Sequence, residues 1–244
     1  MTVNDSVWQS AAVTRFFLDG VRGAIPLAAE QIDVMLRVIR AAKPDTRNFL
    51  DLGCGSGVLG HALLTAFPAA HGVFLDFSAP MLDAARQNLN AAASRISFIQ
   101  CDYGQPDWVV AVEAHAPFDA IVSGFSIHHQ PDARKQQLYQ DIFTLLQPGG
   151  VFLNLEHVAP QSAWAEGLFD ELMIDGMFAH SQRTNDGKSR DEVAAAFHSR
   201  EDKAANILAL VETQCTWLRD IGFVEVDCYL KIFELALFGG IKPA

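Results

Sequence analysis

The sequence predicts an α/β fold, a mostly parallel sheet of seven strands with one antiparallel strand, covered by helices. Short apolar runs alternate with segments whose apolar residues recur at helical spacing, which is typical of strands joined by crossover helices. The first run, residues 48–52, leads through a glycine-rich turn into a helical pattern at Val58. Half of the 244 residues are hydrophobic, enough for the core of one domain.

The element order follows from the spacing of these patterns. Strands are expected at residues 48–52, 71–76, 96–103, 118–124, 151–157, 221–228 and 232–240. About three residues separate the last two strands, too few for a parallel crossover, so we expect an antiparallel pair. The predicted parts of the single domain are an N-terminal helical lid (1–45), a core (46–157), a helical insertion that helps to cover the substrate (158–220) and a closing strand pair (221–244).

The composition indicates which class of substrate and which cellular compartment to expect. The net charge is −11 with 18 Lys and Arg, which favours a small-molecule substrate over a nucleic acid. No apolar stretch is long enough to span a bilayer, and the first six residues lack the basic and apolar regions of an export signal. The four cysteines show no C-x-x-C spacing, as expected for reduced thiols. These features predict a cytoplasmic protein without a membrane partner; a homodimer stays open.

The glycine-rich turn has two other interpretations. Residues 55–60 satisfy the dinucleotide pattern G-x-G-x-x-G, but that pattern begins two residues late because Gly53 precedes it, and it stays open as an alternative. Residues 187–189 resemble the end of a phosphate loop, but Gln182 occupies the position of the required glycine. Residues 50–57 instead match motif I of the class I S-adenosylmethionine (SAM)-dependent methyltransferases, [LIV]-D-[LIV]-G-x-G-x-G, at every specified position. The chain therefore resembles that family, with its Rossmann-like fold.

Two further acids support the resemblance. Asp76 ends the second strand, nineteen residues after Gly57, where a carboxylate can accept both hydroxyls of a ribose. A helix cap is the other interpretation of Asp76, although Ser78 suits that role better. Asp102 ends the third strand, and the resemblance implies contact with the adenine amine, with the backbone of Tyr103 nearby. A Leu-x-Pro-Gly-Gly segment before a strand, residues 146–150, also recurs in the family.

The resemblance implies a cofactor, SAM, with S-adenosylhomocysteine as product, and a set of cofactor-binding residues. These are Arg22, Asp51, Gly53, Cys54, Gly55, Gly57, Asp76, Phe77, Met81, Asp102, Tyr103, Ser123 and Gly124.

The loop after the fourth strand is expected to face the substrate. His128 is the candidate catalytic base and His129 the reserve, because histidine titrates near working pH. The alternative is that one imidazole only holds the loop. Glu156, His157 and Tyr229 complete the expected substrate-binding set with His128. These histidines and the glutamate lie on different elements, so no metal site is expected.

The function expected from the resemblance is methyl transfer from SAM to O or N of a small organic acceptor, as in small bacterial enzymes of this family. Residues 22–26 also resemble a segment of carboxy-SAM synthase, which suggests an enzyme that converts SAM itself. That reaction needs a cation for a second carboxylate, with Lys231 and Arg219 as candidates. A non-catalytic SAM-binding protein is the third alternative.

Overall fold

The computed structural model describes residues 24–200 and 205–244, and within them seven strands form one sheet in the order β3-β2-β1-β4-β5-β7-β6. The strands are β1 (Asn48–Leu52), β2 (His71–Asp76), β3 (Ile96–Gln100), β4 (Phe118–Gly124), β5 (Leu146–His157), β6 (Val224–Ile232) and β7 (Leu235–Ile241). All neighbours pair in parallel except β7, which is antiparallel to both β5 and β6. The mostly parallel sheet with one antiparallel strand is therefore confirmed.

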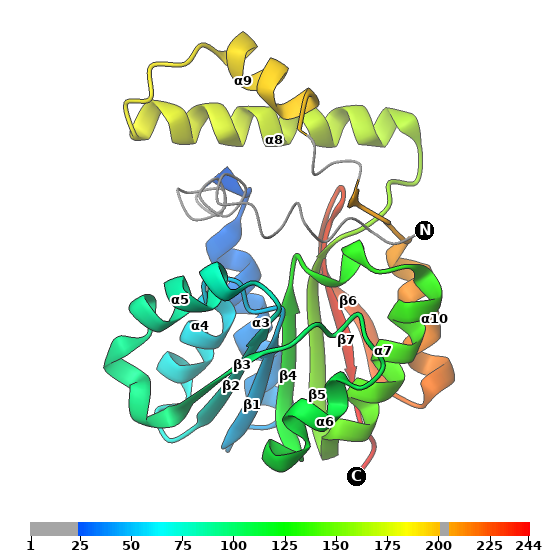
Figure 1. The fold of residues 1–244 in the computed structure, drawn as a ribbon. Coiled ribbons are helices and arrows are strands. Elements are labelled where there is room, and N and C mark those ends of the chain that lie inside the picture. The colour runs from blue at the N-terminus through cyan, green and yellow to red at the C-terminus, as the bar shows by residue number, and fades with distance from the viewer. Residues whose placement is uncertain (1–23, 201–204) are drawn as a thin grey trace.

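Helices cover both faces of the sheet (Figure 1). The helices are α3 (Ala28–Ala42), α4 (Val58–Ala66), α5 (Ala79–Asn88), α6 (Trp108–Val112), α7 (Asp132–Leu145), α8 (Ala163–Arg183), α9 (Arg190–His198) and α10 (Val211–Ile221), with short 3₁₀ turns η3 (Asn90–Arg95), η4 (Glu113–His115) and η5 (Ile127–His129). One core cluster packs α3, α4 and α5 on one face, and another packs α6, α7 and α10 on the opposite face. None of the helices in the described ranges has the length and apolar character required to cross a membrane.

Several expected strand boundaries differ from the structure; β5, for example, begins at Leu146 and not at residue 151, and β6 begins at Val224 and not at residue 221. The third strand ends at Gln100, not at residue 103, because Asp102 turns the chain by accepting the Gly104 N–H at 2.7 Å. The last hairpin turns at Phe233 and Glu234, so that β6 extends to Ile232 and the final strand begins later than expected. Phe233 has a φ of 50°, in the left-handed region that such a tight turn requires.

The segment after β5 forms a cap above the carboxyl ends of the parallel strands (Figure 1). This confirms a helical insertion before the last two strands. Its apolar cluster packs Phe169, Met173 and Ile174 of α8 against Phe197 of α9 and Leu235 of β7.

The segment expected as an N-terminal lid divides into two parts. Its helix α3 packs on the sheet through buried Met35 and Ile39. Ile25, just before α3, lines the cavity beneath the cap. Residues 1–23 lie outside the described residues.

A buried lysine holds the segment that leads from the cap to α10. Lys135 of α7 is 1% exposed; its ammonium donates to Asp132 Oδ1 at 2.7 Å and to the Ile207 carbonyl. The Ile207 N–H in turn donates to the His128 carbonyl at 2.9 Å. Gln214 of α10 donates to the Ala209 carbonyl at 3.1 Å. Residues 205–210, which we call the strap, are thereby fixed against η5.

We expect Lys135→Met to lower the free energy of unfolding by about 1–3 kcal/mol, because the Ile207 carbonyl then loses its charged donor in a buried setting. Urea denaturation followed by circular dichroism measures the change. The matched control is Lys231→Met on the exposed side of β6, for which we expect a change within about 0.5 kcal/mol. Equal midpoints for the two variants would contradict this role of Lys135.

Candidate functional site

A cavity of about 640 Å³ lies between the carboxyl ends of the strands and the cap. Of the expected site residues, the cavity is lined by Gly53, Cys54, Gly55, Asp76, Phe77, Met81, Asp102, Tyr103, Gly124, His128, His129 and His157. Most of these follow the ends of β1, β2, β3 and β4, which meet at one edge of the sheet. Asp51, Gly57, Ser123, Glu156 and Tyr229 do not line it, and Arg22 lies outside the described residues.

The turn after β1 exposes backbone to the cavity. Gly53 has a φ of +65°, and a Cβ there would lie 2.0 Å from Ser126 Oγ, so no larger residue fits. Gly55 has a φ of +52°, and a Cβ there would meet no atom within 4 Å, because that side of the turn is open. A flat or ribose-like group can therefore approach the main chain at Gly55.

Asp51 supports this turn from behind. The side chain is 1% exposed, and its Oδ2 accepts the Gly60 N–H at 2.8 Å. Gly60 lies in the first turn of α4, whose N–H groups have no partner within the helix. Asp51 therefore caps α4 from outside the cavity lining, and its contact with a cofactor stays a prediction.

Asp76 lies at the end of β2 and lines the cavity. It is 7% exposed at the end of β2; Oδ2 accepts the Gly55 N–H and Oδ1 accepts the Ser78 N–H, both at 2.8 Å. Burial raises the pKa of Asp76 above its ordinary value, and hydrogen bonds from Ser78, Gly55 and Phe77 oppose that rise. Each carboxylate oxygen keeps capacity for a second donor, such as a ribose hydroxyl.

The end of β3 and the end of β4 contribute further walls. Asp102 holds the turn after β3, and its Oδ2 accepts from Gln105 Nε2 at 3.2 Å. Tyr103 shares a 2.6 Å hydrogen bond with Ser126, and burial raises the pKa of its phenol. Ser123 does not reach the cavity, because its hydroxyl donates to the Leu52 carbonyl at 2.8 Å within the sheet.

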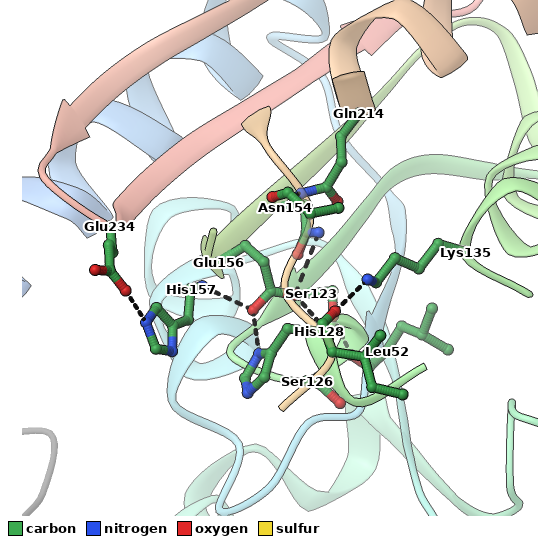
Figure 2. Close-up of polar contacts among 12 residues, drawn as sticks. Leu52, Ser123, Ser126, His128, Lys135, Asn154, Glu156, His157, Gln214 and Glu234 are labelled. Carbon is green, nitrogen blue, oxygen red and sulfur yellow. Dashed lines mark hydrogen bonds and ion pairs between the residues drawn. The ribbon is translucent and has the colours of Figure 1, made fainter. Parts of the chain in front are cut away.

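A buried carboxylate orients His128. Glu156 of β5 is 1% exposed, and its Oε1 lies 2.5 Å from His128 Nδ1 (Figure 2). Its Oε2 also accepts the backbone N–H of His128 at 2.9 Å. With Nδ1 bound to Glu156, Nε2 is the ring nitrogen of His128 that remains for a group in the cavity, and in the neutral ring it is an acceptor. This carboxylate–imidazole arrangement can take a proton from a bound hydroxyl.

A second carboxylate–imidazole pair lies beside the first. His157 Nε2 is 2.7 Å from Glu234 Oε2, and the rings of His128 and His157 are 5.8 Å apart between centroids (Figure 2). Both His157 and Glu234 line the cavity. Glu234 is not among the residues expected from the sequence, because residues 232–240 resemble one continuous strand. The acid between two apolar runs is the signal in the sequence that marks it.

The cap supplies part of an apolar wall for the cavity. Phe169 and Met173 line the cavity from the cap, whereas Trp164 is 77% exposed and Phe233 is 40% exposed. Tyr229 does not reach it; its hydroxyl donates to the Glu225 carbonyl at 2.6 Å on β6. Within residues 24–200 and 205–244, no group of three or more His, Cys, Asp or Glu is arranged to hold a metal ion.

Comparisons with known proteins agree with this geometry. Residues 49–150 match the family described as "Methyltransferase domain". The chain is 22% identical over 256 residues to a carboxy-S-adenosyl-L-methionine synthase of Pseudoalteromonas translucida (strain TAC 125), covering 99% of this chain and 100% of that protein. It is 32% identical over 174 residues to a trans-aconitate 2-methyltransferase of Acidovorax sp. (strain JS42), covering 66% of this chain and 59% of that one.

A solved structure shows the same fold. An O-methyltransferase family protein from Burkholderia thailandensis aligns with a TM-score of 0.70 at 17% identity. The alignment covers 100% of this chain and 64% of the other, so this chain spans less than two thirds of that protein.

We expect acid to destabilise the protein through His129. Burial, followed by the positive charge of His128, lowers the pKa of His129 from 6.5 to about 2; His157 and Lys135 also lower it, and a hydrogen bond with the Ala205 backbone raises it. The unfolded chain therefore binds a proton below pH 6.5 that the folded chain does not. Stability from this group is complete above pH 6.5 and falls by at most about 1.4 kcal/mol per pH unit as the pH decreases.

Urea unfolding of wild type and His129→Gln at pH 7, 6 and 5 tests this expectation. The decrease in unfolding free energy should be shallower in the variant. His61→Gln, an exposed histidine on α4, should keep the wild-type slope. Parallel slopes for wild type and His129→Gln would show that His129 titrates normally.

Proposed function

The chain belongs to the class I SAM-dependent methyltransferases, and from this premise we propose that it transfers a methyl group from SAM to a hydroxyl of a small organic acceptor, with His128 as the base. The observation that carries the proposal is the buried Glu156–His128 pair at the cavity wall. Transfer to oxygen benefits from such a base, because a hydroxyl must lose its proton as the new bond forms.

The residues at the ends of β1 to β3 fit SAM. Asp76 offers a buried carboxylate for the ribose hydroxyls, and the open side of Gly55 lets the ribose approach the backbone. Phe77 and Met81 supply apolar surface beside it for the adenine. Of the described residues that line the cavity, Arg200 is the one Lys or Arg. The lining therefore offers little positive charge for the phosphates of a dinucleotide.

When bound, SAM supplies a methyl group already activated on a sulfonium, so the protein mainly aligns the acceptor. His128 Nε2 accepts the proton of the acceptor hydroxyl. Glu156 keeps Nδ1 protonated and stabilises the imidazolium that forms. The cap contributes the apolar side chains of Phe169, Met173 and Phe197 to the wall of the cavity.

An enzyme that converts SAM itself is the alternative, favoured by the carboxy-SAM synthase relative that matches along its whole length. It needs a cation for a second carboxylate. Arg219 donates to the Val226 carbonyl, and neither it nor Lys231 lines the cavity; among the described residues, Arg200 is the cation in the lining. Mass spectrometry distinguishes the products, a methylated acceptor with S-adenosylhomocysteine or a carboxymethyl sulfonium.

We expect Asp76→Ala to weaken SAM binding by about 1–3 kcal/mol, roughly 5- to 150-fold, because hydrogen bonds to a charged acceptor are lost. Calorimetric titration measures the change. Asp83→Ala removes an exposed carboxylate of α5 and should keep the wild-type affinity. Undiminished affinity in Asp76→Ala would contradict the ribose assignment.

His128→Asn should lower kcat by about 10²- to 10⁴-fold while the dissociation constant of SAM stays the same, because only proton transfer is lost. Glu156→Gln should give a smaller loss, since the ring keeps its place with a neutral partner. Release of S-adenosylhomocysteine with a panel of phenols, hydroxy acids and sugars provides the assay. Full activity of His128→Asn on every accepted compound would exclude His128 as the base.

A further inference from the structure

Glu234 has one carboxylate oxygen that the protein leaves without a donor. The residue lies at the turn between β6 and β7, is 3% exposed, and lines the cavity. Its Oε2 is bound to His157, whereas its Oε1 is buried and has no hydrogen bond with any residue of the described ranges. Figure 2 shows this second oxygen pointing away from the His157 ring. A buried acceptor without a partner is rare and calls for an explanation.

Glu234 lies on the same side of the cavity as His157 and His128, which we call the acceptor half. His157 is hydrogen-bonded to Glu234, and the centroid of the His128 ring lies 5.8 Å from that of the His157 ring. The far ring nitrogen of His157, Nε2, is already occupied by Glu234. His128 Nε2 and Glu234 Oε1 are two polar atoms of this wall that have no protein partner among the described residues.

The surface around these two groups is apolar and partly aromatic. Phe169 of the cap lies 5.3 Å from the His157 ring, tilted by 40°, and Leu235 follows Glu234 directly on β7. Aromatic and aliphatic walls of this kind favour a flat apolar body.

Building on the proposed function, we propose that Glu234 binds the acceptor through Oε1, and that the acceptor carries two donor groups. One is the hydroxyl that loses its proton to His128 and is methylated. The other is a hydroxyl or amino group that donates to Glu234. A carboxylate that must be satisfied by the substrate discriminates strongly against analogues lacking the donor.

The test uses three probes that differ in the second group: 1,2-dihydroxybenzene, 2-aminophenol and phenol. Calorimetric titration with S-adenosylhomocysteine present gives their dissociation constants, and product analysis with SAM gives kcat/KM. Wild type should bind the first two at least about tenfold more tightly than phenol. In Glu234→Gln this preference should fall toward one, with KM for the two-donor probes rising more than kcat falls.

Glu225→Gln, on the exposed part of β6, is the control and should keep the wild-type preference. The proposal is overturned if wild type shows no preference among the probes, binds none of them, or shares its preference with Glu234→Gln. Methylation is scored separately from binding. If 1,2-dihydroxybenzene binds through Glu234 and is not methylated, the binding site stands and the proposed function fails.

Discussion

The Glu156 carboxylate is the contact on which the arrangement of the site depends. It accepts from the His128 ring, from the His128 backbone and from the His157 backbone, the last at 2.9 Å. Burying a carboxylate is unfavourable unless it accepts hydrogen bonds. Loss of any of these contacts would therefore leave the buried Glu156 carboxylate with an unsatisfied oxygen. The orientation of His128 is therefore fixed by the interior of the sheet and not by the surface loop that carries it.

This loop lies where the strand order reverses. From β1 the chain builds outward to β2 and β3, then returns to place β4 on the other side of β1. Open α/β sheets bind ligands at such a point, outside the carboxyl ends of the strands. Asp76 and Asp102 belong to the β2–β3 side, whereas His157 and Glu234 belong to the β5–β7 side. Under the proposed function, His128 stands between a cofactor half and an acceptor half.

The sequence was sufficient to predict residues that follow strand ends, because parallel strands bring their carboxyl ends to one edge whatever the details of packing. Asp76, Asp102 and His128 line the cavity for this reason. Side-chain direction was harder to predict. Glu156 and His157 are adjacent, and the alternation of a strand sends one into the core and the other toward the cavity.

The closing hairpin shows a different limit. The pairing of β6 with β7 shifts register between Cys228 and Leu230, which breaks the simple alternation of side chains around Tyr229. Glu234 was hidden because a tight turn at Phe233 interrupts what reads as a continuous apolar strand. Such features depend on pairing with β5 and β7, which local patterns do not encode.

His128 and His157 each bind a buried glutamate, but through different ring nitrogens. In histidine, Nδ1 lies near the backbone and Nε2 at the far end of the ring. His128 is held through Nδ1, so its far nitrogen is the one offered to the cavity; His157 is held through Nε2, so its far end is occupied. Under the proposed function, the base must reach the acceptor, which favours His128. It must also become charged during proton transfer, and Glu156 provides the opposite charge without rearrangement, because its contacts are already formed.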